Sequence, residues 1–228
     1  MANDDVHTGS GSAMDLALKP FGISLRLDER AQVAKYMDLL MRWSRVVNLT
    51  AIREPTEVLQ RHFGESMYLA QRVELRGALL DVGSGAGFPG LALKIACPEV
   101  AVTLLEPVGK KRAFLKEVAR SCQLENVRVL SDRIERFCQH RENRFDYVTL
   151  RAVGSFDSVL PAIARCLVPT GRACLWLTAR EARDLAERSP AFTGLFAWDP
   201  ALPVPLSHGR EIWCGGLCHP EGHVSRET

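Results

Sequence analysis

The chain has 228 residues, of which 46% are apolar, and a formal net charge of +2. This length supports one well-buried core with a small additional unit, and the near-neutral charge excludes a general polycation, so any affinity for nucleic acid must come from a local patch. No apolar run approaches the roughly 20 residues of a membrane span. The first five residues lack the basic region of a secretory signal, and the seven cysteines form no Cys-x-x-Cys pair. Both features predict a cytoplasmic protein with reduced thiols.

The polypeptide divides into three predicted stretches. Residues 1–13 are polar and rich in glycine and serine, a composition that predicts a disordered tail. Residues 14–76 carry apolar side chains at helical spacing and predict a small helical subdomain, in which Asn48-Leu49-Thr50 and the following Pro55 separate two helices. Residues 77–228 alternate short apolar runs with amphipathic ones, which predicts an α/β domain.

The elements of the α/β domain follow from this alternation. The segments expected to be strands are 101–105, 127–130, 145–150 and 171–177, after a first strand at Leu79, and those expected to be helices are 90–96, 110–122 and 155–166. The tail after Ala191 contains several prolines and then the apolar run Ile212-Trp213-Cys214. This tail predicts antiparallel edge strands on a mostly parallel sheet.

A glycine-rich loop follows the first strand of this domain. It reads Asp81-Val82-Gly83-Ser84-Gly85-Ala86-Gly87-Phe88-Pro89-Gly90. Glycines let the backbone approach a ligand where a Cβ would collide, and a loop that opens a helix presents free amide groups to it. The second strand closes on Glu106, a carboxylate placed to accept the hydroxyls of a ribose. Together the loop and the carboxylate predict a nucleotide-cofactor site.

Two cofactor classes use such a layout. The dinucleotide pattern Gly-x-Gly-x-x-Gly fits Gly85, Gly87 and Gly90, but it starts two residues after the first bend. The other register, with Asp81 two residues before Gly83 and then alternating glycines, is typical of class I methyltransferases, which bind S-adenosyl-L-methionine (AdoMet). AdoMet has no pyrophosphate, and Asp81 suits its ammonium group. We therefore favour AdoMet over a dinucleotide or a purely structural turn.

Further motifs appear in order around this loop. They are Trp43-x4-Asn48-Leu49-Thr50-Ala51-Ile52, Arg61-His62-x2-Glu65-Ser66, Leu105-Glu106-x2-Gly109-Lys110-Lys111, Arg133-Ile134-Glu135 and Phe145-Asp146-x4-Arg151-Ala152. With the loop, they resemble the bacterial 16S rRNA methyltransferase G family, once called glucose-inhibited division protein B, over roughly residues 16–213. The expected fold is a class I AdoMet-dependent methyltransferase fold, Rossmann-like, with an antiparallel carboxyl-terminal edge and a preceding helical subdomain.

The resemblance implies a reaction, a partner and a set of contacts. The reaction is methylation of N7 of a single guanine, conventionally numbered 527, in 16S rRNA, presented as naked rRNA, as the small ribosomal subunit or as its assembly intermediate. The implied AdoMet contacts are Gly83, Phe88, the adenine-side pair Ile134 and Glu135, and Arg151. We expect a monomer that does not engage a membrane.

The residues themselves add to this cofactor site and mark departures from the family. Asp81, Gly85 and Glu106 complete the predicted AdoMet contacts. The catalytic residue is left unassigned, and Arg151, at the end of a central strand, is the best candidate for positioning the substrate or the methyl group. An ion pair of Arg151 with Asp146 or Glu135 is the structural alternative.

Two further positions differ from the family. Glu65 stands where the family has an aspartate, which keeps the carboxylate. Thr178 follows the fifth strand where a lysine is common, and Arg180 is a possible replacement for its charge.

The chemistry agrees with motifs that the sequence does not contain. Guanine N7 carries a free lone pair, so its methylation needs no proton abstraction, and positioning should supply most of the catalysis. The fourth strand runs into Thr149-Leu150-Arg151-Ala152 instead of the Asp/Asn-Pro-Pro-Tyr motif of amino methyltransferases. The pair Cys97-Pro98 reverses the Pro-Cys order of pyrimidine carbon-5 methyltransferases, and we interpret Cys97 as a small buried hydrophobe.

The remaining candidates concern RNA and metal. Lys110, Lys111 and Arg112 open a basic segment that predicts contacts with RNA phosphates, with an ordinary solvated helix face as the alternative. His62 is predicted either to contact RNA or to pack between helices. The cysteines and histidines of 208–223 lack a zinc-knuckle spacing, so no metal is expected. The functional alternatives are a methyltransferase for another RNA, a protein or a small molecule, a dinucleotide-dependent oxidoreductase, and a non-enzymatic AdoMet-binding assembly factor.

Overall fold

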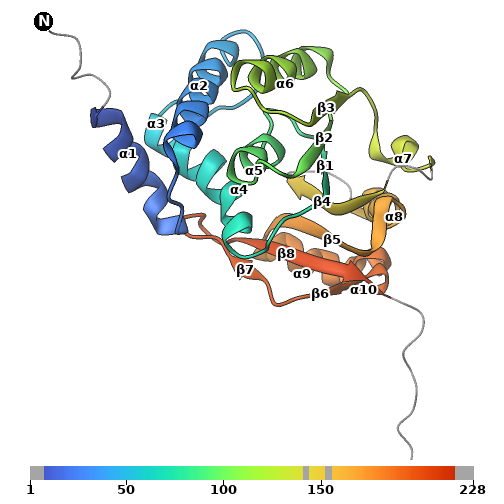
Figure 1. Cartoon of the computed structure of the whole chain (residues 1–228). Coiled ribbons are helices and arrows are strands. Elements are labelled where there is room, and N and C mark those ends of the chain that lie inside the picture. The colour runs from blue at the N-terminus through green and yellow to red at the C-terminus, as the bar shows by residue number, and fades with distance from the viewer. Residues whose placement is uncertain (1–7, 141–143, 152–155, 219–228) are drawn as a thin grey trace, which may run out of the picture.

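A single mixed sheet forms the centre of the protein. The computed structural model describes residues 8–140, 144–151 and 156–218. The strands are β1 (Ala78–Val82), β2 (Ala101–Leu105), β3 (Val127–Leu130), β4 (Phe145–Arg151), β5 (Leu167–Thr178), β6 (Phe196–Trp198), β7 (Leu202–Pro203) and β8 (Arg210–Leu217). In this part of the chain they follow the order β3-β2-β1-β4-β5-β8-β6, with β7 paired to β8. The first five strands are parallel, and the last three form the antiparallel edge, which confirms the predicted sheet (Figure 1).

Helices cover both faces of the sheet. They are α1 (Thr8–Leu18), η1 (Lys19–Phe21), α2 (Leu27–Trp43), α3 (Pro55–Val58), η2 (Leu59–Gly64), α4 (Glu65–Met67), η3 (Tyr68–Gln71), α5 (Gly90–Ala96), α6 (Gly109–Ser121), α7 (Ile134–Phe137), α8 (Phe156–Cys166), α9 (Ala179–Arg188) and α10 (Pro190–Leu195). On one face, α5 packs on β1 and β2 beneath α2, and on the other α8 packs on β4 and β5 beside α7 and α10 (Figure 1). Parallel strands that are covered on both faces have apolar side chains pointing to either side. The consecutive residues Leu79 and Leu80 of β1 are both fully buried for this reason.

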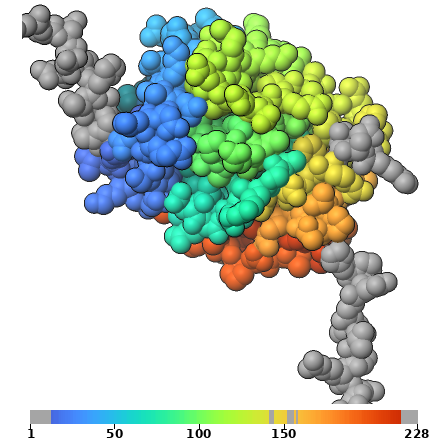
Figure 2. All heavy atoms as spheres, in the orientation of Figure 1, coloured from blue at the N-terminus to red at the C-terminus, as the bar shows by residue number. Residues whose placement is uncertain are grey.

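The N-terminal helices share one core with the sheet. Tyr36 of α2 and Phe63 of η2 belong to the same buried apolar cluster as Leu91 of α5 and Phe114 of α6. Figure 2 shows the blue and cyan N-terminal segment lying directly against the green part of the α/β domain. The predicted helical stretch therefore forms an additional layer on one face of the sheet.

The second N-terminal helical run contains a π-helical segment. The run continues through α3, η2, α4 and η3, and η2 has the wider π turn, which is often found at functional sites. Arg61 and His62 lie on this turn. Gly64 follows them, and a Cβ there would lie 2.5 Å from the ring of Phe21, so the glycine permits close packing against η1.

Two predicted boundaries are wrong. Helix α1 begins at Thr8, inside the stretch predicted as a disordered tail, because Met14, Ala17 and Leu18 of this helix are buried in the core. Residues 1–7 lie outside the described part of the chain. Strand β5 begins at Leu167, four residues before its predicted start, directly after α8. In both cases tertiary packing overrides local composition.

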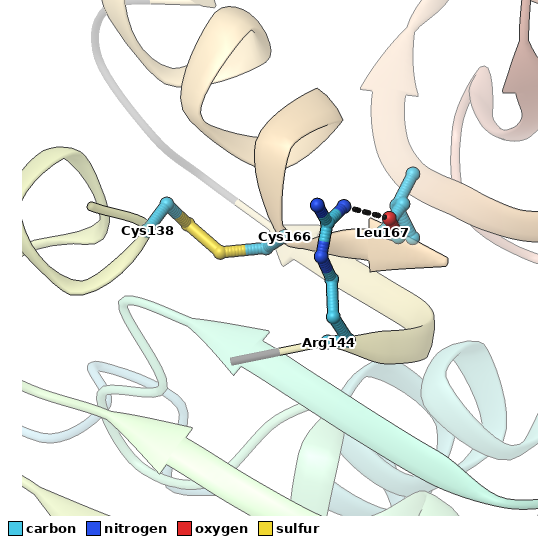
Figure 3. Close-up of a disulfide and its surroundings, with 4 residues drawn as sticks. All are labelled: Cys138, Arg144, Cys166 and Leu167. Atoms are coloured by element: carbon cyan, nitrogen blue, oxygen red, sulfur yellow. Dashed lines mark hydrogen bonds between the residues drawn. A yellow bond between two sulfur atoms is a disulfide. The ribbon is translucent and has the colours of Figure 1, made fainter. Parts of the chain in front are cut away.

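One cysteine pair contradicts the prediction of reduced thiols. Cys138 and Cys166 form a disulfide across 28 residues (Figure 3). Cys138 directly follows α7 and Cys166 ends α8, so the bond joins two helices that pack on each other; beside it, Arg144 Nη1 donates to the carbonyl oxygen of Leu167 at 2.8 Å (Figure 3). Spacing along the chain carries no sign of this pairing. The remaining cysteines within the described residues are free: Cys97, Cys122, Cys174, Cys214 and Cys218.

The described residues contain neither a helix suited to crossing a membrane nor a cluster suited to binding a metal ion. None of their helices combines the length and apolar character that a membrane crossing requires. No cluster of three or more histidine, cysteine, aspartate or glutamate side chains in this part of the chain could hold a metal ion. His219 and His223, two members of the carboxyl-terminal cysteine and histidine group, lie outside the described residues.

Candidate functional site

A pocket of about 360 Å³ opens at the carboxyl ends of β1 and β4. These strands are neighbours in the sheet, and the chain leaves them on opposite sides, an arrangement that places ligand sites in α/β folds. Its lining residues come from six separate segments: Leu49, Ile52, Arg61, His62, Gly83, Ser84, Gly85, Ala86, Phe88, Lys111, Arg151 and Arg210. The pocket thus has a glycine wall, an apolar wall and a cationic wall.

The glycine wall satisfies its own amide groups. Gly83, Gly85 and Gly87 have φ angles of 68°, 55° and 89°, which side-chain-bearing residues rarely adopt. The N–H groups of Gly83 and Ser84 donate to the carbonyl oxygen of Leu105 at 2.9 and 3.0 Å, and that of Gly87 donates to the carbonyl of Ser84. The expectation of free amides is therefore wrong for these residues. A loop whose amides are bound within the protein is poorly suited to a pyrophosphate.

Glu106 fastens this loop to the end of β2. Its Oε2 accepts a hydrogen bond from the N–H of Gly85 at 2.9 Å, and its Oε1 accepts one from the N–H of Val108 at 2.8 Å. Each carboxylate oxygen keeps a second lone pair, so Glu106 retains acceptor capacity for a ribose hydroxyl. Its observed contacts stabilise the loop, which the sequence did not indicate.

Gly85 borders open space in the pocket. A Cβ built on it would meet nothing closer than the carbonyl oxygen of Gly83 at 3.7 Å, so a side chain there would extend into the pocket. Beneath the loop, Asp81 is buried, and its Oδ2 has no hydrogen-bond partner. Burial raises the pKa of Asp81 to about 6. Asp81 does not line the pocket, so its negative charge would act on a cationic ligand through the loop.

The cationic wall is organised by one carboxylate. Glu65, at the start of α4, is almost fully buried, and its Oε2 accepts hydrogen bonds from Arg151 Nη2 at 2.7 Å and Arg210 Nη1 at 2.6 Å. Arg61 Nε lies 3.8 Å from Oε1, and neither of these two atoms has a hydrogen-bond partner in the described structure. With Lys111, four cationic side chains line the pocket, and three of them surround the buried carboxylate of Glu65.

Arg151 occupies the position predicted for it but has a different partner. Besides Glu65, it donates to Ser66 Oγ at 3.2 Å and to the carbonyl oxygen of Arg61 at 2.8 Å. Burial lowers its pKa to about 10, so it stays charged at neutral pH. The alternative prediction, an ion pair of Arg151 with Asp146 or Glu135, is wrong because Arg151 pairs with Glu65. The Asp146 carboxylate accepts a hydrogen bond from the N–H of Ala78 at the opposite end of β4, and the Glu135 carboxylate accepts one from Ser158 Oγ.

Arg210 is the pocket residue that the sequence reasoning missed. It opens β8, and the antiparallel register places it opposite Thr178, the last residue of β5. Thr178 and Glu181 form a capping box that ends β5 and starts α9 at this point. Arg180, the predicted replacement for the missing lysine, is exposed at the start of α9 near Asp184. An arginine at the start of the predicted last strand was the available signal.

The apolar wall contains a column of three stacked rings. The rings of Tyr36 and Phe88 lie 5.0 Å apart at 4°, and those of Phe88 and His62 lie 4.7 Å apart at 13°. His62 Nε2 lies 2.8 Å from Thr50 Oγ1. Burial, followed by the positive charges of Arg151, Arg61 and Arg210, lowers the pKa of His62 to about 3, so the imidazole is neutral at physiological pH. Phe88 therefore stacks on two rings, and Phe63 packs against it edge to face with the ring centroids 5.1 Å apart.

The basic segment splits into residues with different roles. Lys111 lines the pocket beside the glycine loop, whereas Lys110 is exposed. Arg112 Nη1 donates to the carbonyl oxygens of Glu106 and Pro107 at 3.0 and 2.6 Å, so it braces the turn after β2. One residue of the predicted RNA-binding segment, Lys111, therefore belongs to the lining of the pocket.

A second hollow lies beyond the end of β2. It measures about 280 Å³ and is lined by Pro107, Ser131, Asp132, Arg133 and Arg136. The predicted adenine-side residues Ile134 and Glu135 begin α7 immediately after Arg133, with Ile134 buried in the core. Pro107 lines this hollow, and the adjacent Glu106 bonds to Gly85 of the first pocket, so the turn after β2 connects the two hollows.

Solved structures support the fold. A SAM dependent methyltransferase from Aquifex aeolicus matches with a TM-score of 0.57 and 15% identity over 72% of this chain and 94% of that chain. MtNAS, a variant of which was solved in complex with S-adenosylmethionine, matches with a TM-score of 0.55 and 15% identity over 93% of this chain and 80% of that chain. These likenesses confirm the class I methyltransferase fold.

Sequence comparisons identify the family. The chain is 43% identical to the ribosomal RNA small subunit methyltransferase G of Chloroflexus aggregans, over 67% of this chain and 68% of that protein. It is 39% identical to that of Pseudomonas aeruginosa, over 60% of this chain and 63% of that protein, so the matched region spans about two thirds of the relatives' length or less. The GidB family, described as rRNA small subunit methyltransferase G, matches residues 29–196. The predicted resemblance is confirmed, and the chain belongs to this family.

Proposed function

We propose that this protein is an AdoMet-dependent methyltransferase that methylates N7 of guanine 527 in 16S rRNA of the small ribosomal subunit, acting as a cytoplasmic monomer. The relatives are small subunit rRNA methyltransferases, and the fold is that of AdoMet-dependent enzymes. The observation that carries the choice of N7 is the composition of the pocket. Its lining, among the described residues, includes no aspartate, glutamate or cysteine.

The pocket therefore offers no strong base and no nucleophile. Methylation of an exocyclic amine or a hydroxyl removes a proton, and carbon-5 methylation of a pyrimidine needs a thiolate. The lining includes the imidazole of His62, but its pKa of about 3 makes this ring a weak base. Guanine N7 attacks through a lone pair that carries no proton, so this lining suits that atom. Positioning then supplies most of the rate acceleration.

The cofactor site is proposed from the two hollows and the loop between them. The methionine part would lie against Gly83 and Gly85, the ribose against Glu106, and the adenine near Ile134 and Glu135. AdoMet supplies an electrophilic methyl group on a positively charged sulfur. Asp81 favours that positive charge from below the loop, and Arg151 faces the pocket from the end of β4.

The RNA site is proposed on the cationic side. Four cations line the pocket, three of them paired with the buried carboxylate of Glu65, and Lys110 extends the positive surface outward. This excess of positive charge suits the phosphates that flank a target nucleotide. A methyltransferase for an uncharged small molecule has no need of it.

Mapping of N7-methylguanine tests the proposal. Small subunits from cells lacking this protein are incubated with the purified protein and AdoMet, and the rRNA is cleaved with borohydride and aniline. We expect one new cleavage at guanine 527 in the wild-type reaction. Gly85→Asp should give none, because a carboxylate would enter the proposed methionine site. Subunits carrying 7-deazaguanosine at the target should accept no methyl group.

Other outcomes decide between the alternatives. Transfer to the subunits without cleavage at this guanine would move the reaction to another nucleotide or atom. Tight AdoMet binding with transfer only to a protein or a small molecule would replace the RNA substrate. AdoMet and subunit binding without any transfer would make the chain an assembly factor. Binding of NAD in preference to AdoMet, measured by calorimetry, would contradict the inference from the loop amides.

A further inference from the structure

We infer that His62 is the platform on which the target base stacks, and that the base becomes the fourth ring of the column formed by Tyr36, Phe88 and His62. The inference deepens the proposed function, because it assigns a contact for a flipped purine nucleotide within the same pocket. It depends on geometry that no single stretch of sequence displays: the three rings come from α2, the glycine loop and η2.

The column has one buried end and one open end. Tyr36 is fully buried at the inner end, where its hydroxyl donates to the carbonyl oxygen of Ala86. His62 ends the column and lines the pocket, and among the described residues no aromatic ring other than Phe88 packs on it. A flat aromatic surface at the mouth of a column is the usual receptor for an unstacked base.

The position of the ring matches the demands of methyl transfer. His62 and the glycine loop line the same pocket, so a base on His62 lies across from the proposed methionine site. Enzymes that modify a base take it out of its stack and hold it between flat side chains and polar contacts. Arg61 and Arg210 line the cationic wall of the same pocket, and their positive charges suit the phosphates of such an extruded nucleotide.

The local structure holds the His62 ring in place. The contact with Thr50 Oγ1 and the stack on Phe88 define its orientation from two directions. Burial, and after it the charges of three neighbouring arginines, disfavours a charged imidazole, which leaves a neutral ring beside a base that gains positive charge when N7 is methylated. A protonated ring in this position would oppose that gain of charge.

The test separates the ring from its nitrogen atoms. His62→Phe keeps a flat ring and loses both nitrogens, His62→Ala loses the ring, and His140→Ala removes an exposed histidine outside the pocket as the matched control. We expect His62→Ala to raise KM for subunits lacking the methyl group by about tenfold or more, in line with the loss of one base stack. His62→Phe and His140→Ala should stay within about threefold of wild type, and AdoMet affinity and thermal unfolding should change little in all three.

A second measurement observes stacking without methyl transfer. The probe is 2-aminopurine riboside 5′-monophosphate, whose fluorescence is quenched when its base stacks on a ring. We expect quenching by the wild type and by His62→Phe, and its loss in His62→Ala.

Equal quenching by His62→Ala, or a His62→Phe variant as impaired as His62→Ala while folded, would overturn the inference. Because this readout needs no reaction, it tests the stacking site even if guanine N7 proves not to be the acceptor. Failure of the proposed function appears separately, as absent methylation by the wild type.

Discussion

The glycine wall and the cationic wall of the pocket are built in opposite ways. One continuous loop forms the first, and its amides bond within the loop and to the end of β2. Arginines from η2, β4 and β8 and a lysine from α6 form the second, and the buried carboxylate of Glu65 brings the three arginines together. The first depends on the absence of side chains and the second on the presence of one charge. Substitutions should therefore damage the two walls through different physical effects.

The largest effect is expected from removing the charge at the centre of the cationic wall. Glu65→Gln leaves the partly buried Arg151 and Arg210 without their buried counterion, which should lower the free energy of unfolding by about 3–5 kcal/mol. Urea denaturation measures this loss, and Glu65→Asp should recover part of it. Glu57→Gln, which removes an exposed partner of Arg61, should cost less than about 1 kcal/mol. Equal stability of the two glutamine variants would contradict the central role of Glu65.

The buried charge beneath the glycine wall should act in the opposite direction. Burial raises the pKa of Asp81 from 3.8 to about 6, so the folded state holds this proton more tightly than the unfolded state does. Stability contributed by this group therefore falls as the pH rises from about 4 to about 6, and the full penalty remains above that range. Asp81→Asn should stabilise the protein by up to about 3 kcal/mol at pH 7.5, and by roughly half of that at pH 5.

The same variant should bind AdoMet more weakly, because the negative charge beneath the loop is gone. Urea unfolding at the two pH values and an AdoMet titration measure both effects. A destabilised Asp81→Asn protein would show that the carboxylate is compensated by contacts absent from the described structure. Unchanged AdoMet affinity would show that the charge does not act through the loop.

Two alanine substitutions in one loop should separate folding from binding. A Cβ on Gly87 would collide with the Tyr36 hydroxyl and lie 2.8 Å from Leu91 Cδ1, so Gly87→Ala should cost about 1–3 kcal/mol of stability. A Cβ on Gly85 meets open space, so Gly85→Ala should cost about 1 kcal/mol for its positive φ while reducing AdoMet affinity more strongly. Thermal unfolding and calorimetry report the two effects. The opposite ranking would mean that the loop changes shape when the cofactor binds.

The smallest effect should distinguish two neighbouring lysines. Lys111→Glu places a negative charge in the pocket lining, and we expect it to weaken both AdoMet and RNA binding. Lys110→Glu alters an exposed site, so it should leave AdoMet affinity unchanged and reduce the log-log salt slope of RNA binding by about 1. Titrations across a salt series measure both slopes. If the two variants behave alike, the segment acts as a single solvated face.

Local patterns predicted much of the fold. The bounds of β2 and β3 match the predicted segments 101–105 and 127–130, because short apolar runs between turn signals are characteristic of buried parallel strands. The glycine loop and the family were read from residues adjacent in the chain. The stacking of Tyr36 and His62 on Phe88 could not be predicted in this way, since both residues lie on helices that end more than 20 residues before Phe88.

The sequence by itself determined the bounds of several strands, the glycine loop, the cofactor class and the family. Each of these depends on backbone preferences and side chains within short stretches of the chain. Only the tertiary structure decided that Arg210 reaches the pocket, that Glu65 binds three arginines, and that Cys138 meets Cys166. Those contacts depend on the register of β5 with β8 and on the packing of helices. Burial then gives them their strength, since charges removed from water interact strongly and must be paired.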